Sequence, residues 1–347
     1  VDLSLTHGVT RASGYGLAGY GTYLAGALGR VVRADAFGQL ALRLNERAGD
    51  DALTAKIHQL VGVLIVGWVR PFIAGRDLLQ QGYRLGLRTG DLTAACYNAT
   101  SLVLMQLARN ASVGEVRDTV DALLRESGRV LEVHGSEVLH MAGRWSRVLA
   151  DELPTPTPET ADAWIRDVFD PGFERPNALL ALYHGICRMQ ILYLFGCHDA
   201  ILPLPPQATE RLGAFATPVA VDAVYLPALV ACARAAPTRA RIGEFDEFDE
   251  FAELTAADPF AEVAAALARL ARWAADCPAN FAARHALLAA EYARVRGHDD
   301  EAARRYKDAI LAARRHGEAG TEALACELAG EHAAALGDDV LSDMYFQ

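Results

Sequence analysis

The stretch FAARHALLAAEYARVRGHDDEAARRYKDAILAARR, from Phe281 to Arg315, contains the clearest helix, turn and helix unit in this chain. Residues 297–300, GHDD, interrupt the helical pattern. After this break Ala302, Tyr306 and Ala309 lie four and then three residues apart, so they share one helix face. A hairpin of this length cannot cover its own apolar face, so we expect it to stack on similar hairpins. The unit predicts an all-α fold that presents a surface and carries no chemistry of its own.

The spacing of Gly297, Ala302, Tyr306 and Ala309 resembles the second half of a tetratricopeptide repeat. In the first half, alanines stand where that family favours an aromatic residue or Leu, a Leu, a Gly or Ala, and a Tyr: Ala286, Ala289, Ala290 and Ala293. The hairpin therefore resembles a divergent member. The resemblance implies a TPR-like α-solenoid of stacked antiparallel helical hairpins.

The composition favours a folded, helical and acidic chain. Of the 347 residues, 52% are hydrophobic and the mean hydropathy is +0.11, which excludes a generally disordered protein. Abundant alanine favours helix. The net charge is −11, and Lys56 and Lys307 are the only lysines, so phosphate-backbone binding has little electrostatic support. We expect no nucleic-acid partner.

The cysteines and the apolar runs predict a cytoplasmic protein. The six cysteines form no CxxC pair and lie in apolar helical contexts, which indicates buried thiols in a reducing compartment. The apolar run from Leu60 to Val69 is too short to span a membrane. Because the chain starts at Val1 and ends soon after Tyr345, within a predicted helix, we expect it to be a fragment of a larger protein.

Proline-rich breaks predict the domain boundaries. LPTPTP, from Leu153 to Pro158, cannot be helical, and a second break follows at residues 170–176. We predict N-terminal helical-hairpin repeats in residues 1–152, a Pro-rich break with a short helix in 153–176, and C-terminal TPR-like hairpins in 177–347. Apolar spacing predicts helices at 33–48, 53–69, 73–88, 92–108, 113–126, 130–150, 160–168, 177–195, 207–215, 219–235, 260–275, 281–296, 299–315 and 321–335, with a further start at Asp338.

Gly14, Gly16 and Gly19 spell GxGxxG, the dinucleotide fingerprint. That motif needs a strand before it and a phosphate-binding helix after it, and neither is indicated here. Glycines continue through what is predicted to be one helix. Close packing of a small-residue helix therefore explains the spacing better than nucleotide binding.

Several catalytic motifs are missing from the sequence. It contains no Gly-Lys-Ser or Gly-Lys-Thr, no HRD or DFG, and no GxSxG. His134, Glu137 and His140 are spaced i, i+3 and i+6, which differs from the HExxH of zinc proteases and indicates a polar stripe on a surface helix. We predict no cofactor and no metal. An α-helical enzyme that uses this trio or the GxGxxG glycines remains a third hypothesis.

The segment RIGEFDEFDEFAE spaces Phe245, Phe248 and Phe251 three residues apart among acidic residues. Three-residue spacing drifts around a helix. The segment is therefore predicted as a short helix docked by its phenylalanines, with a partner-binding peptide segment as the alternative.

Four stretches of the chain are similar to one family: FGQLALRL at 37–44, LLQQGYRLGLRTGDLTAACYNA at 78–99, LARWAADCPANFAARHALLAAEYARVRGHDDEAARRYKDAI at 270–310, and EALACELAGEHAAALGDD at 322–339. The family is the helical-repeat region of large bacterial signalling proteins. In these proteins a serine/threonine-kinase-like domain and a STAND-type ATPase module precede the repeats, and GAF and sensor histidine-kinase domains often follow. Many alanines stand where the family has larger residues.

The resemblance implies a sensor or scaffold arm that binds a partner or ligand and holds the attached ATPase in check. No catalytic residue is carried over, because the kinase and ATPase motifs of the family lie outside this chain. In tetratricopeptide repeats the first helix of each hairpin lines the concave face. The matching polar positions are Arg284, Glu291 and Arg294, which we predict as partner-binding residues.

Two main functional hypotheses result. The first is a non-catalytic scaffold that binds a protein or peptide, such as the neighbouring ATPase or kinase domains of the same protein. The second is a small-molecule-sensing module in which the apolar helix 177–195 lines a pocket.

Overall fold

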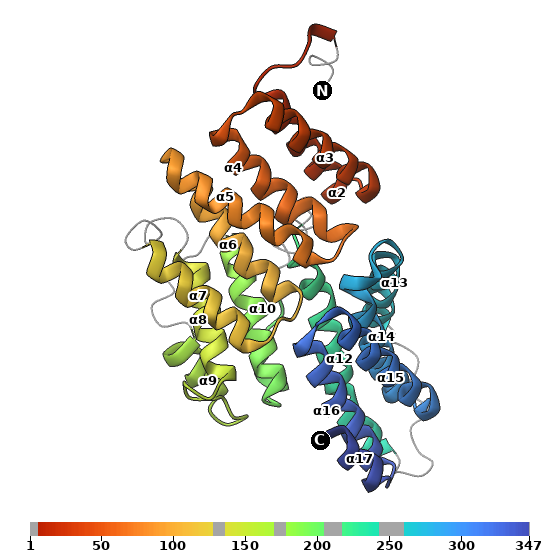
Figure 1. Ribbon diagram of the computed structural model, residues 1–347. Coiled ribbons are helices and arrows are strands. Elements are labelled where there is room, and N and C mark those ends of the chain that lie inside the picture. Colours follow the sequence, from red (N-terminus) through yellow and green to blue (C-terminus); the bar gives the residue numbers. More distant parts are fainter. Residues whose placement is uncertain (1–5, 128–135, 170–177, 205–216, 243–259, 347) are drawn as a thin grey trace. The chain divides into compact units, whose positions relative to one another are not determined.

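The protein is all-α. A computed structural model describes residues 6–127, 136–169, 178–204, 217–242 and 260–346 (Figure 1). Every regular element in these ranges is a helix, which confirms the predicted all-α class. The α-helices are α2 (Ser13–Gly26), α3 (Val31–Ala48), α4 (Asp51–Gln59), α5 (Arg76–Thr89), α6 (Leu92–Ala108), α7 (Val113–Ser127), α8 (Ser136–Leu149), α9 (Ala161–Trp164), α10 (Ala178–Leu194), α12 (Ala220–Ile242), α13 (Ala261–Asp276), α14 (Pro278–Val295), α15 (Asp299–His316), α16 (Ala319–Ala335) and α17 (Asp339–Phe346).

The predicted helices at 53–69 and 73–88 differ from the structure. The α-helix α4 ends at Gln59, and the chain continues as a π-helix, η1 (Leu60–Ile65), and a 3₁₀ turn, η2 (Val66–Trp68). The second helix begins as a 3₁₀ turn, η3 (Phe72–Gly75), before α5. The reason is a close backbone contact, because a Cβ on Gly75 would lie 2.1 Å from the Gly62 carbonyl oxygen. The backbones of Gly62 and Gly75 approach each other closely here, and apolar spacing does not indicate such a contact.

The chain divides into two compact units that interleave in sequence. The first contains residues 1–155, 163–191 and 204–222, and the second contains 156–162, 192–203 and 223–347. The chain therefore passes from one unit to the other within α10 and within α12. The predicted division at 153–176 did not anticipate that residues 163–191 and 204–222 belong with the N-terminal helices.

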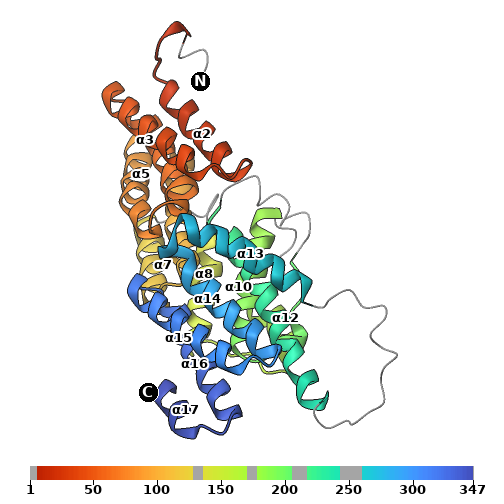
Figure 2. The ribbon, with the colours of Figure 1, turned by 90° about the vertical axis from the view of Figure 1, so that its right-hand side faces the viewer.

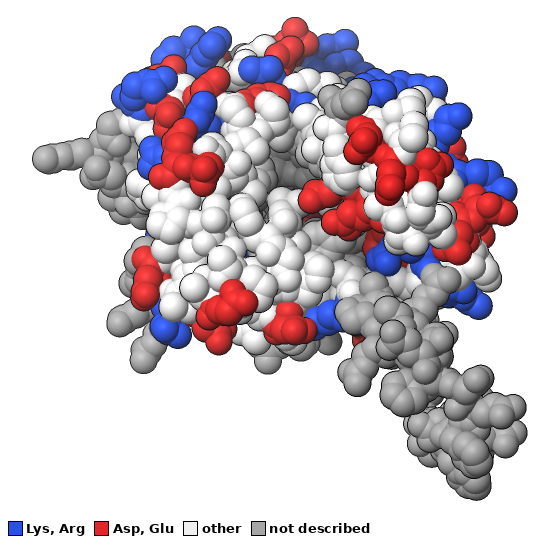
Figure 3. Space-filling model, turned by 90° about the horizontal axis from the view of Figure 1, so that it is seen from below, with Lys and Arg blue, Asp and Glu red and all other residues white. Residues whose placement is uncertain are grey.

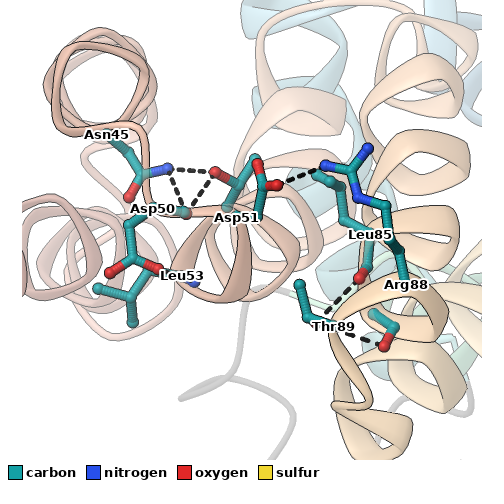
Figure 4. Close-up of polar contacts among 9 residues, drawn as sticks. Asn45, Asp50, Asp51, Leu53, Leu85, Arg88 and Thr89 are labelled. Carbon is teal, nitrogen blue, oxygen red and sulfur yellow. Dashed lines mark hydrogen bonds and ion pairs between the residues drawn. The ribbon is translucent and has the colours of Figure 1, made fainter.

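In the first unit, helices that follow each other along the chain pack together: α2 on α3, α4 on α5, α5 on α6, and α7 on α8. Side-chain hydrogen bonds hold the turn between α3 and α4 (Figure 4). The Asp50 carboxylate accepts a hydrogen bond from the Leu53 N–H at 3.1 Å and so caps α4, while the Asn45 amide donates to the Asp50 carbonyl at 3.3 Å. Asp51 and Arg88 form an ion pair between α4 and α5.

The GxGxxG glycines lie inside α2, as the packing interpretation requires, and no described strand precedes them. A Cβ on Gly14 would lie 3.2 Å from the Ala41 carbonyl oxygen, so this glycine allows α2 to approach α3. Gly16 and Gly19 have no atom of the described chain within 4 Å of such a Cβ. Close contact between helices therefore explains why a glycine stands at position 14, but it does not explain Gly16 or Gly19.

In the second unit, α13 to α17 each pack on the next helix along the chain (Figure 2). The three residues predicted to share one face of α15 are all buried: Ala302, Tyr306 and Ala309. Gly297 and Gly317 adopt positive φ angles of 80° and 71° on either side of α15, the left-handed conformation that ends a helix. The predicted hairpin at 281–315 is therefore present as α14 and α15.

The described helices include none that combines the length and the apolar composition needed to cross a bilayer. All six cysteines are free thiols. Five are buried as predicted, and Cys326 is half-buried.

Candidate functional site

A cavity of about 360 Å³ lies within the second unit. Side chains from the end of α10 and the turn after it, and from α12, α14 and α16, form its wall. The lining mixes apolar side chains with carboxylates, an arginine, a tyrosine and two histidines. Such a mixed lining is typical of a binding site that fixes the orientation of a ligand with a few polar groups.

A buried polar network forms part of the cavity wall. On α14, Arg294 donates two hydrogen bonds to the Glu291 carboxylate, with Nε at 2.9 Å from Oε1 and NH2 at 2.6 Å from Oε2. The Tyr306 hydroxyl, from α15, donates to the same Oε1. The Glu291 side chain is 0% exposed and that of Arg294 is 23% exposed. Two-point pairing of this kind holds both side chains in a fixed geometry.

Burial and charge act on this network in opposite directions. Burial disfavours the charged form of Arg294, but the hydrogen bonds and the charge of Glu291 outweigh it, so the pKa of Arg294 is raised. Burial, and then the Glu291 charge, raise the pKa of Tyr306. Arg294 therefore stays charged and Tyr306 stays protonated at any physiological pH.

Tyr193, in the last turn of α10, brings a polar group into the same wall. The residue is 6% exposed, and its hydroxyl has no hydrogen-bond partner among the residues that the structure describes. Its ring centroid lies 5.1 Å from that of His198, which also lines the cavity. Burial, and then the Glu291 charge, raise the pKa of Tyr193 well above its usual value. The hydroxyl is therefore protonated and available to a ligand.

Helix α16 contributes two leucines and two carboxylates to the cavity. Leu324 and Leu328 are half-buried, whereas Glu327 and Glu331 have exposed surface and lie four residues apart on one helix face. Partial burial of the carboxylate, and then the charge of Glu331, raise the pKa of Glu327. Helix α16 contains no Lys or Arg to offset these two like charges, and its one histidine, His332, lies in its last turn.

The ends of three helices add to the negative potential of the cavity. Leu194 is the last residue of α10, Arg294 lies in the last turn of α14, and Ala335 is the last residue of α16. The carboxyl end of a helix carries a partial negative charge of about half an electron. All three residues line the cavity. The site therefore favours positive charge in a ligand.

The surrounding surface has the same sign. From residue 316 onward the chain contains no Lys or Arg but seven acidic residues: Glu318, Glu322, Glu327, Glu331, Asp338, Asp339 and Asp343. Figure 3 shows acidic side chains gathered on the right-hand side of the lower face, where α17 lies. Of these seven acidic residues, Glu327 and Glu331 line the cavity.

The three polar residues predicted to bind a partner differ in burial and in their contacts. Arg284 is 0% exposed, with NH1 at 3.2 Å from the Asn280 carbonyl oxygen and 3.7 Å from Glu318 Oε2. The structure thus gives Arg284 a structural role as an ion-pair partner, and its predicted role in partner binding stays a prediction. Glu291 is also fully buried and holds Arg294 in place. Of the three, Arg294 alone has exposed side-chain surface at the cavity.

The other predicted candidates do not contribute to the cavity. Phe245, Phe248 and Phe251 lie outside the described residues, so their predicted role stays a prediction. Of the trio on the polar stripe, His134 also lies outside, and Glu137 and His140 are exposed on α8. In the described part of the chain, no group of three or more His, Cys, Asp or Glu side chains is arranged to hold a metal ion.

Sequence reasoning missed Tyr193, Glu327 and Glu331. A signal existed for the two glutamates, since they are like charges four residues apart on one helix, in a region without Lys or Arg. Tyr193 gave no signal, because it lies in an apolar helix in which many positions are buried.

The first unit contains a second, smaller hollow of about 260 Å³ between Tyr15 and Tyr97. Its one charged lining residue, Lys56, forms an ion pair with Asp91 at 3.0 Å. This hollow therefore offers a ligand less unbalanced charge than the cavity of the second unit.

Comparison with protein-family models, with curated proteins and with solved structures found no match to this chain.

Proposed function

We propose that this chain is a non-catalytic, TPR-like α-solenoid that binds a protein or peptide partner and regulates an attached ATPase or kinase in bacterial signal transduction. The cavity of the second unit is its docking site. The main support is that exposed Glu327 and Glu331, and the part-exposed Arg294, meet there on a rigid wall of packed helices. Preorganised charged groups of this kind give a docking surface its specificity.

The succession of packed helices supports the solenoid. Each of α13 to α17 packs on the next helix along the chain, and α14 also contacts α16. A helix pair in such an array leaves one face available, and its neighbours cover the rest. Glu291 and Arg294 lie on the first helix of the hairpin, the helix that lines the concave face in tetratricopeptide repeats.

Titration calorimetry with the neighbouring ATPase module of the parent protein, added as a separate polypeptide, tests this proposal. We expect saturable binding, with a dissociation constant of about 1–100 µM that is typical of a small interface. We also expect the ATPase rate to change when this chain is added. Absence of both binding and a rate effect at about 100 µM would overturn the proposal.

One observation favours small-molecule sensing as a second candidate. Tyr193 and Leu194, at the end of the apolar helix that the sequence associates with a ligand pocket, do line the cavity. A thermal-shift screen of small molecules separates the two functions. A ligand that raises the melting temperature of the wild-type protein but not that of a Tyr193→Phe variant would favour this candidate.

A further inference from the structure

We infer that the cavity of the second unit binds a guanidinium or ammonium group carried on an apolar stem. This chemistry is shared by an Arg or Lys side chain of a peptide and by a free alkylguanidine or alkylamine. The inference rests on the proposed function, because it specifies what the docking site recognises.

The charges around the cavity are unbalanced toward negative. The charge of Arg294 is neutralised by Glu291, to which it donates two hydrogen bonds. The cavity lining contains no other Lys or Arg to pair with Glu327 and Glu331, and its two histidines are His198 and His332. A cation placed between them would relieve the repulsion between two carboxylates four residues apart.

The Tyr193 hydroxyl indicates where a ligand makes a directed contact. The Tyr193 side chain is 6% exposed and lines the cavity, and no hydrogen bond joins its hydroxyl to another described residue. The hydroxyl oxygen is not one of the fully buried polar atoms of the described chain, so a ligand in the cavity can reach it. The tyrosine oxygen can accept a hydrogen bond from a guanidinium or ammonium N–H. This contact is independent of the acidic side chains.

The apolar part of the lining accommodates the stem of the ligand. Leu324 and Leu328 lie on the same helix as the two glutamates and are half-buried, so they offer apolar surface next to the charged groups. Arginine and lysine bury their methylene stems against such surface while the charged head stays with polar groups. A bare metal ion or a small inorganic cation would leave these leucines uncovered.

Matched pairs of probes test the inference by titration calorimetry with the full chain. The first pair is butylguanidinium and its neutral isostere N-butylurea. The second pair is the peptide acetyl-Ala-Leu-Arg-Leu-Ala-amide and the same peptide with citrulline in place of arginine. We expect the charged member to bind about tenfold or more tightly than the neutral one, since hydrogen bonds to charged groups are the stronger kind.

The two pairs distinguish the source of the cation. Charge-dependent binding of the peptide alone, or of the peptide more tightly than butylguanidinium, assigns the site to a peptide side chain. Charge-dependent binding of butylguanidinium alone assigns it to a small molecule. Either result supports the inference.

Three variants locate the binding. Glu327→Gln combined with Glu331→Gln should weaken binding of the charged probe about tenfold or more, and Tyr193→Phe should weaken it severalfold. Asp343→Asn on α17 is the matched control, because it removes one exposed acidic charge outside the cavity and should change affinity less than about twofold. Circular dichroism establishes that each variant is folded.

Equal binding of charged and neutral probes, or no binding of either, would overturn the inference. So would loss of binding in Asp343→Asn equal to that in the double glutamine variant. The proposed docking function would survive these results if the ATPase module still bound the wild-type chain. It would fail separately if that module did not bind.

Discussion

At the scale of single residues, Arg284 shows how a charged side chain can serve the fold. It is among the largest fully buried side chains, and its neighbour Glu318 is 2% exposed. We predict that Arg284→Met destabilises the protein by about 3–5 kcal/mol, because the Glu318 carboxylate then stays buried without its ion-pair partner. Urea unfolding followed by circular dichroism measures this loss.

A double variant separates charge from packing at this site. Arg284→Met with Glu318→Gln should lose less stability than the sum of the two single variants, because it leaves no uncompensated charge. Strictly additive losses would contradict the ion-pair explanation.

A substitution at Gly75 tests the close backbone contact in the segment between α4 and α5. A Cβ there would meet the Gly62 carbonyl oxygen at 2.1 Å, and a backbone atom inside a packed segment cannot move away easily. We predict that Gly75→Ala costs about 2 kcal/mol or more in unfolding free energy. The matched control, Gly16→Ala in α2, meets open space and should gain about 0.5–1 kcal/mol from better helix propensity. Similar effects of the two substitutions in urea unfolding would refute the contact.

At the scale of elements, local signals predicted most helices and failed where distant parts of the chain meet. The helix predicted at 92–108 has these bounds in the structure, because Asp91 caps its start by accepting a hydrogen bond from the Ala94 N–H at 3.0 Å. This capping signal is local and visible in the sequence. The π-helical and 3₁₀ turns between Leu60 and Gly75 depend on a contact between two distant glycines, which periodicity cannot indicate.

The start of α4 provides a prediction at this scale. Asp50→Ala removes the acceptor for the Leu53 N–H and should cost about 1 kcal/mol of stability. The adjacent Asp51→Ala removes only an exposed ion pair with Arg88, whose side chains are 54% and 65% exposed, and should change stability by about 0.5 kcal/mol or less. Thermal unfolding of the two variants compares them directly (Figure 4). A larger loss for Asp51→Ala would mean that the cap is not the main contact.

At the scale of the whole molecule, the all-α class followed from composition and the hairpin pattern, whereas the candidate site did not. One predicted helix contains Arg284, Glu291 and Arg294. Sequence spacing alone did not distinguish the side of this helix that packs on the next helices from the side that faces the cavity. The buried Glu291 carboxylate accepts a hydrogen bond from the Tyr306 hydroxyl of α15, which lies on the other side of the turn. The cavity also needs Tyr193, which lies about a hundred positions earlier in the chain. Such assembly of distant residues is a property of the fold and is not encoded in any local pattern.

The concentration of acidic charge predicts how pH and salt affect cation binding. The pKa of Glu327 is raised above its usual value, so Glu327 loses its charge at a higher pH than an ordinary glutamate when the solution is acidified. A bound cation stabilises the ionised form, and protonation therefore competes with binding. We predict that affinity for butylguanidinium falls as the pH drops through the raised pKa of Glu327. Salt should also weaken binding, because it screens the exposed Glu327 and Glu331.

Titration calorimetry between pH 7 and pH 4.5 measures the pH effect, with circular dichroism at each pH to establish that the protein stays folded. Glu327→Gln should bind more weakly at pH 7 and show a flatter pH profile, because it lacks the titrating group. Asp343→Asn, with its charge removed away from the cavity, should keep the wild-type profile. If Glu327→Gln retained the wild-type slope, another group would be responsible for the pH dependence. Glu331, whose charge contributes to the raised pKa of Glu327, would be the next residue to replace.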